Sequence, residues 1–216
     1  MNNVDKTERA YRISHEYFDR LTKEKLAEAI RITIEGDDTI IGVNGVLRIF
    51  KLHDLDLANG HVMSRVIEKY LAKAMHKIFK EYDFIFEHGS ENSQDKDIVC
   101  VKKPDDFFIE TVENDPKYFS IELKTRLWEY KSSIAGNKSY KEGSKNQQKD
   151  RNAFYIYIAY ELPKITDDYA VKRYKAYFTF INQEDWGNVH DGSSSATVTI
   201  SKFKTASGES RLIEII

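Results

Sequence analysis

Two short runs decide the fold: Lys96-Asp97-Ile98-Val99-Cys100-Val101 and Tyr118-Phe119-Ser120-Ile121-Glu122-Leu123-Lys124-Thr125. Each run is rich in β-branched and aromatic residues, the composition of a buried strand, yet each carries charged side chains. Burying an unpaired carboxylate costs on the order of several kcal/mol. We therefore expect Asp97, Glu122 and Lys124 either to lie on exposed faces or to be held together by a compensating group such as a divalent metal ion.

The composition is that of a folded protein, with 41% hydrophobic and 31% charged residues in a chain of 216. This length suits one domain, or a core domain with a small lobe. A net charge of −2 excludes a protein that coats polyanions by charge alone, but it permits a local basic face. The single cysteine, Cys100, excludes a disulfide framework and a cysteine-rich zinc site. Without a signal peptide or a long apolar run, we expect a soluble cytoplasmic protein with no membrane contact.

Apolar periodicity predicts helices before the two runs and strands around them. Helical patterns cover 5–34, with a break near Thr22, and 62–80, whose wide apolar stripe predicts packing on the core. Segment 40–50 fits either a hairpin or the start of a helix. A helix is also expected at 145–151, and further strands at 83–87, 107–112, 153–160, 174–181, 196–203 and 211–216. This order predicts an α/β (α+β) fold with a central mixed β-sheet flanked by helices.

Charged side chains in the second run share one face of the predicted strand. Side chains alternate along a strand, so Glu122 and Lys124 are neighbours, and a strand that begins at Asp97 could bring a second carboxylate beside them. Two carboxylates and the backbone carbonyl of Leu123 would form a partial shell for Mg²⁺. Lys124 would then help to orient a metal-bound water, an arrangement suited to phosphodiester hydrolysis. The alternative is an ordinary ion pair between Glu122 and Lys124 on a half-exposed strand.

At these residues the sequence resembles the PD-(D/E)xK nuclease superfamily, and more narrowly the Type II restriction endonucleases. Asp97 matches the first aspartate of the family motif, Glu122 its second acidic residue and Lys124 its lysine. Glu68 stands where many members have a helical glutamate that adds to the metal shell. Lys96 occupies the place of the proline in the motif, which is a departure from the pattern.

Two of these matches have alternatives. Asp95 is a competing first ligand, and Asp97 is preferred because it directly precedes the strand-forming run. Glu68 lies at the edge of the apolar stripe of 62–80. It could therefore instead be a surface glutamate paired with Arg65, Lys69 or Lys73.

The resemblance covers roughly residues 60–162 and implies a restriction-endonuclease-like core. It implies cleavage of double-stranded DNA with Mg²⁺, or Mn²⁺ as a substitute, to give 5′-phosphate and 3′-hydroxyl ends. It also implies a homodimer, because cutting both strands of a palindromic site calls for two active sites related by a two-fold axis. Within one nuclease domain, 1–58 would be a mainly helical subregion and 59–216 the catalytic core with the C-terminal strands. A companion DNA methyltransferase is expected in the host, without direct contact.

Residues 124–151 form a basic segment in a slightly acidic chain, with eight Lys or Arg against three Asp or Glu. Such a cluster beside the predicted metal site favours a surface that follows DNA phosphates, and the interleaved amides can pair with base edges. The alternative is a solvated, lysine-rich loop and helix. The candidate DNA-binding residues are Arg126, Lys131, Asn137, Lys138, Ser139, Lys141, Lys145, Asn146, Gln147, Gln148 and Lys149.

Three functions remain open at this point. The favoured one is a site-specific DNA endonuclease of a restriction-modification system. The second is a repair or junction-resolving nuclease of the same superfamily, for which DNA structure rather than sequence would decide the cut. The third is a non-catalytic DNA- or protein-binding module.

Overall fold

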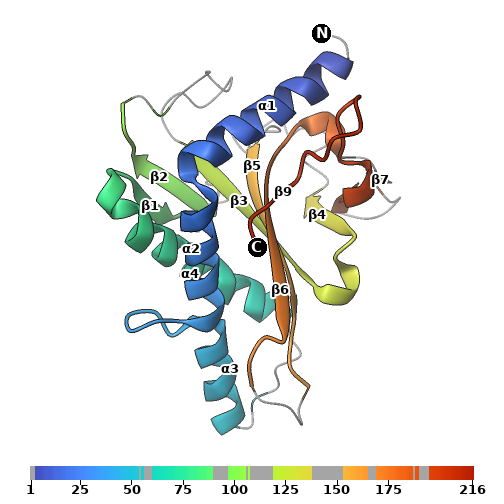
Figure 1. Cartoon of the computed structure of the whole chain (residues 1–216). Coiled ribbons are helices and arrows are strands. Elements are labelled where there is room, and N and C mark those ends of the chain that lie inside the picture. Colours follow the sequence, from blue (N-terminus) through green and yellow to red (C-terminus); the bar gives the residue numbers. More distant parts are fainter. Residues whose placement is uncertain are drawn as a thin grey trace.

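A six-stranded mixed sheet carries helices on one face and a three-stranded sheet on the other (Figure 1). The computed structural model describes residues 3–53, 55, 60–89, 97–105, 107, 119–137, 153–164, 169–186, 188–189 and 195–216. The mixed α/β architecture predicted from the order of elements is confirmed. None of the helices within these residues is long and apolar enough to cross a bilayer.

Four α-helices precede the sheet in the described part of the chain: α1 (Asn3–Leu21), α2 (Lys23–Glu35), α3 (Gly42–Leu52) and α4 (Gly60–Phe79). The predicted break at Thr22 is confirmed, because this residue adopts a φ of 61° that no helix accommodates. Segment 40–50 is a helix rather than a hairpin. Val43 and Leu47 are four residues apart and both are buried, as on the packed face of a helix. This packing outweighs the preference of Asn44–Gly45 for a hairpin turn.

The main sheet has the order β1-β2-β3-β5-β6-β9, and only the β3–β5 pairing among these is parallel. β5 is fully buried from Ala153 to Tyr160, as expected of a central strand covered on both faces. Pro163 follows shortly after this strand. The strands are β1 (Ile85–His88), β2 (Ile98–Lys102), β3 (Phe119–Leu127), β5 (Ala153–Glu161), β6 (Arg173–Ile181) and β9 (Ile213–Glu214).

Two apolar cores lie on opposite faces of this sheet. On one face, residues such as Ile121 and Ile156 pack against α1, α2 and α4. On the other face, Tyr155 and Tyr157 pack against Ile134 and its neighbours in the smaller sheet. This sheet has the order β4-β8-β7 and consists of β4 (Ser133–Asn137), β8 (Ser195–Thr199) and β7 (Asn188–Val189).

β4 is absent from the sequence-based assignment, because Ile134 is its only large apolar residue and long-range pairing with β8 defines it. The predicted terminal strands are shorter than expected: 196–203 is β8 followed by a 3₁₀ turn, and 211–216 contains only β9. The strand expected at 107–112, except Phe107, and the helix at 145–151 lie outside the described residues. Four 3₁₀ turns complete the described elements: η1 (Lys80–Tyr82), η2 (Trp128–Tyr130), η3 (Gln183–Asp185) and η4 (Ile200–Lys202).

A buried arginine ties the C-terminal segment to the sheet. The side chain of Arg211 is 1% exposed and makes two contacts of 2.7 Å to the carboxylate of Asp185. It also donates to the carbonyl of Phe180 at 3.2 Å. Removing either partner would leave the other as an unpaired buried charge. The pair therefore stabilises the fold.

Candidate active site

The two runs that carry the candidate residues are adjacent antiparallel strands. β2 pairs with β3 in a register that sets Ile98 opposite Ile121. Asp97 directly precedes β2, so continuing the register by one residue sets it opposite Glu122. Paired residues of an antiparallel ladder project to the same side. Asp97 and Glu122 therefore lie on the sheet face opposite α4, while Ile98 and Ile121 lie in the core under the helices.

Hydrogen bonds connect the candidate residues of the two strands. The Oδ2 atom of Asp97 accepts a hydrogen bond of 2.8 Å from the backbone N–H of Leu123. The ammonium of Lys124 lies 2.6 Å from Oε1 of Glu122. Glu122 is only 2% exposed, so this is a buried ion pair rather than the half-exposed surface pair of the alternative interpretation. A pair of this kind has lost most of its hydration and depends on close neighbours for compensation.

The electrostatics of the site centre on Asp97. Burial and the negative charge of Glu122 raise the pKa of Asp97 to about 6, with a smaller contribution in the same direction from Glu68. The ammonium of Lys124 and the N–H of Leu123 act in the opposite direction and only partly offset the shift. The ionised carboxylate is therefore poorly compensated by the protein alone, and a cation at this position would favour its charged form.

Glu68 reaches the site from the helix side. It is 8% exposed on α4 and accepts contacts of 2.9 Å from Nη1 of Arg65 and 2.6 Å from Nε2 of His88. The ion pair with Arg65 is the one that the surface-glutamate alternative expects, although the carboxylate is buried. Its negative charge raises the pKa of Asp97, which places it within electrostatic range of the other candidates.

His88 is a site residue that sequence reasoning misses. It has no metal-ligand spacing to another histidine, and it reaches Glu68 only because β1 ends there. The β1–β2 pairing sets His88 opposite Ile98, one residue after Asp97. The backbone N–H of Gly89 donates to the carbonyl of Asp97 at 2.9 Å, which holds the end of β1 against the start of β2.

The candidate DNA-binding residues are only partly described. Arg126 lies on β3, on the same face as Glu122 and Lys124. Lys131 is exposed after η2, with its ammonium 4.8 Å from the ring centre of Trp128, and Asn137 ends β4. Outside the described residues lie Asp95, Lys138, Ser139, Lys141, Lys145, Asn146, Gln147, Gln148 and Lys149.

The chemistry of the donors fits Mg²⁺. Asp97 and Glu122 would contribute hard carboxylate oxygens, and Leu123, whose carbonyl is the further candidate ligand, directly follows Glu122 in sequence. No group of three or more His, Cys, Asp or Glu side chains suited to a metal ion occurs in the described ranges. A metal held here would thus retain other ligands from water or substrate, which is common for Mg²⁺. Cys100 is no candidate, because it lies in the helix-side core, where burial raises the pKa of its thiol to about 11.

Comparison of the chain with protein-family models and with curated proteins returns no match. Two carboxylates and a lysine meet on one face of β2 and β3, and a buried glutamate with its own histidine approaches from α4.

Proposed function

We propose that this protein is a Mg²⁺-dependent endonuclease that cleaves double-stranded DNA at a short, specific sequence. The observation that supports this most is the buried Glu122–Lys124 pair beside the poorly compensated carboxylate of Asp97. Clustered acidic groups with perturbed proton affinity are typical of catalytic sites. A carboxylate that is costly to ionise lowers the stability of the folded protein, and a catalytic role gives that cost a function.

The side chains have separable roles in this mechanism. Asp97 and Glu122 would hold the metal, with the carbonyl of Leu123 as a further ligand. When bound, Mg²⁺ supplies Lewis acidity and a more acidic water. The ammonium of Lys124, positioned by Oε1 of Glu122, orients the attacking water and offsets the negative charge that grows on the phosphate. The water oxygen gives up a proton to solvent and bonds to phosphorus as the bond to the 3′ oxygen breaks; the 3′ oxygen takes up a proton from solvent, which leaves a 5′-phosphate and a 3′-hydroxyl.

Glu68 would act beside Asp97 and Glu122 and would not itself bind the metal. Its contacts with Arg65 and His88 fix the carboxylate on the helix side, where its charge adds to the negative field at Asp97. A more negative field increases the attraction for a divalent cation. Cleavage of both strands at a palindrome would need a homodimer, and a companion methyltransferase would protect the host DNA.

The proposal is tested by incubating plasmid DNA of known sequence with the purified protein and Mg²⁺. We expect discrete fragments whose mapped ends share one short sequence, and no cleavage in excess EDTA. Glu122→Gln and Lys124→Met should each lower the rate by at least about 100-fold, the usual scale for losing a catalytic group.

Glu161→Gln is the matched control for Glu122→Gln. Glu161 lies on the adjacent strand β5 and also makes a 2.6 Å ion pair with a basic side chain, that of Arg173. This variant should cut at the wild-type rate. Unchanged cleavage in both Asp97→Ala and Glu122→Ala would contradict the catalytic assignment. Nicking that follows DNA junctions would favour the structure-specific nuclease, and DNA binding without cleavage in Mg²⁺ or Mn²⁺ would favour the non-catalytic module.

A further inference from the structure

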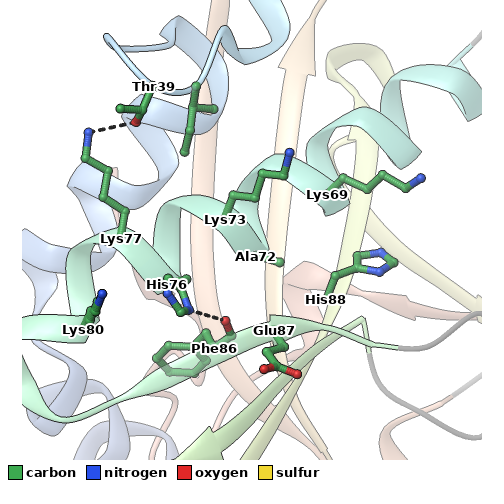
Figure 2. A pocket seen from close by; sticks show the side chains of 11 residues that line it. Thr39, Lys69, Ala72, Lys73, His76, Lys77, Lys80, Phe86, Glu87 and His88 are labelled. Carbon is green, nitrogen blue, oxygen red and sulfur yellow. Dashed lines mark hydrogen bonds between the residues drawn. The ribbon is translucent and has the colours of Figure 1, made fainter.

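A groove of about 700 Å³ lies between α4 and the edge strand β1 (Figure 2). We call it the α4 groove; it is lined by Lys69, Lys73, Lys77 and Lys80 of α4 and η1, by His88 of β1, and by Thr39, towards which Lys77 points. Its floor is apolar and includes the buried ring of Phe86. The proposed catalytic chemistry uses none of these lysines.

The lysines form a row along the helix. Lys69, Lys73 and Lys77 repeat at four-residue intervals, all of them exposed, and Lys80 continues the row into η1. At about 1.5 Å of rise per residue, the row extends for roughly 16 Å. Like charges four residues apart destabilise a helix by about 0.2–0.5 kcal/mol per pair. The row therefore weakens α4 unless an anion neutralises it.

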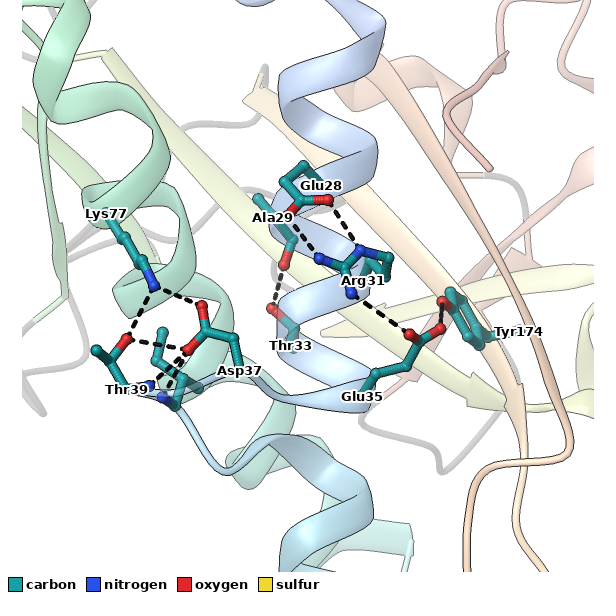
Figure 3. Close-up of polar contacts among 10 residues, drawn as sticks. Glu28, Ala29, Arg31, Thr33, Glu35, Asp37, Thr39, Lys77 and Tyr174 are labelled. Carbon is teal, nitrogen blue, oxygen red and sulfur yellow. Dashed lines mark hydrogen bonds and ion pairs between the residues drawn. The ribbon is translucent and has the colours of Figure 1, made fainter.

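Only one member of the row has an acidic partner among the described residues. Lys77 lies 2.6 Å from Asp37 and 3.1 Å from the hydroxyl of Thr39 (Figure 3). Lys69, Lys73 and Lys80 make no ion pair with a described side chain, and Lys73 lies only loosely over the ring of Tyr70, at 5.9 Å. Glu87 is the acidic residue that lines the groove, so the lining keeps an excess of positive charge.

One end of the α4 groove meets the candidate active site. Lys69 directly follows Glu68, and His88 both lines the groove and contacts the Glu68 carboxylate at 2.6 Å. The groove thus ends at Glu68, whose charge acts on Asp97 although Asp97 lies on the other face of the sheet. DNA carries one phosphate charge per about 1.7 Å of helix axis, so a row of roughly 16 Å faces a run of phosphates, not a single one.

We propose that the α4 groove binds the phosphate backbone of nucleic acid to one side of the cleaved bond. The row of lysines, three of which make no ion pair with a described side chain, fits a linear polyanion, and one end of the row lies beside Glu68 of the candidate site. This inference extends the proposed function and rests on it for the position of the cut, although the binding can be measured without cleavage. An acidic peptide is the competing occupant that the test must separate.

The test measures binding of a fluorescently labelled DNA duplex by anisotropy, in EDTA, over a range of salt concentrations. The variant Lys69→Ala/Lys73→Ala/Lys80→Ala removes the three charges that lack an ion-pair partner in the described structure. If each contacts a phosphate, the slope of log affinity against log salt should become shallower by about 2–3. At about 0.1 M salt the affinity should fall roughly 10- to 100-fold.

The control Lys6→Ala/Lys172→Ala/Lys204→Ala makes the same change in net charge on α1, before β6 and after β8. It should bind within about threefold of wild type, with the wild-type salt slope. Thermal melting verifies that each variant is folded, and alanine at exposed helix positions should not lower the stability of α4. If the melting temperature does fall, Lys69→Gln/Lys80→Gln replaces the triple variant and should still reduce the slope by about 2.

Several results would overturn the inference. These are an unchanged salt slope in the groove variant, an equal loss in the control, or groove-dependent binding of poly-glutamate with no binding of DNA. The two proposals fail separately. Plasmid cleavage with an unaltered slope in the groove variant rejects the groove alone, whereas groove-dependent DNA binding by a wild-type protein that cuts nothing rejects the nuclease and leaves the groove.

Discussion

Replacing Asp97 with asparagine should make the metal-free protein more stable while abolishing cleavage. In the folded chain, burial and the charge of Glu122 raise the pKa of Asp97 from 3.8 to about 6. The ionised form is therefore unfavourable in the folded state at neutral pH. Asparagine removes the charge, and its side-chain oxygen can still accept the hydrogen bond that Asp97 takes from the N–H of Leu123.

The magnitude follows from proton linkage. An acidic group whose folded-state pKa is above its unfolded value binds more protons in the folded state, so stability falls as pH rises from about 4 to 6. A pKa shift of roughly two units lowers the free energy of unfolding at pH 7 by at most about 3 kcal/mol. Because Asp97 is half-buried, solvent screening reduces this, and we expect a gain of about 1–3 kcal/mol. For a chain of this size, that is a rise of about 3–10 °C in melting temperature.

The assay is thermal melting of wild type and Asp97→Asn in EDTA at pH 7.5 and at pH 4. The gain should be present at pH 7.5 and should vanish at pH 4, where Asp97 is already protonated in the folded state. Added Mg²⁺ should raise the melting temperature of wild type but not of the variant, because it binds only a site with both carboxylates. In wild type this shift should weaken as the pH falls below about 6, where protons compete with the metal for Asp97.

Asp37→Asn is the matched control, and its expected effect on stability has the opposite sign. The ammonium of Lys77 and the backbone N–H groups of Thr39 and Ile40 hold the pKa of Asp37 below its usual range. Removing that charge should lower the stability at pH 7.5 and should matter less as the pH falls. If Asp97→Asn melts at or below the wild-type temperature in EDTA at pH 7.5, the electrostatic account of the site is refuted.

Two further predictions concern the surroundings of Asp97, and a third concerns the buried pair of Arg211 and Asp185. Lys124→Met removes the ammonium held by Glu122, so urea titration should show that the free energy of unfolding falls by about 3 kcal/mol, and cleavage should be lost. A variant as stable as wild type would contradict a buried pair. Glu68→Gln weakens the negative field, so carbon NMR should show a lower pKa for Asp97, and an unchanged pKa would separate Glu68 from the site. Arg211→Met breaks the buried pair with Asp185 and should cost about 3–5 kcal/mol, while cleavage per folded molecule stays at the wild-type rate.

Local pattern accounts for most of the elements and for part of the candidate site. The 3.6-residue period of 62–80 and the continuous apolar run of 153–160 predict α4 and β5, because burial of these faces leaves few alternatives. The two-residue period of a strand is enough to place Glu122 and Lys124 on one face. Pattern fails where two interpretations bury similar surface, as at 40–50, and where a strand such as β4 has little apolar content of its own.

By itself, the sequence determined which residue types could carry the chemistry, and that Glu122 and Lys124 share one face of a strand. Only the tertiary structure decided their surroundings: the burial of Glu122, the contact of His88 with Glu68, and the groove that the lysines of α4 line together with the edge strand β1. These features join segments distant in the chain, so they depend on how strands pair and how helices dock, not on the residues next to each in sequence. Periodicity sets the direction in which a side chain points, and packing sets what it meets.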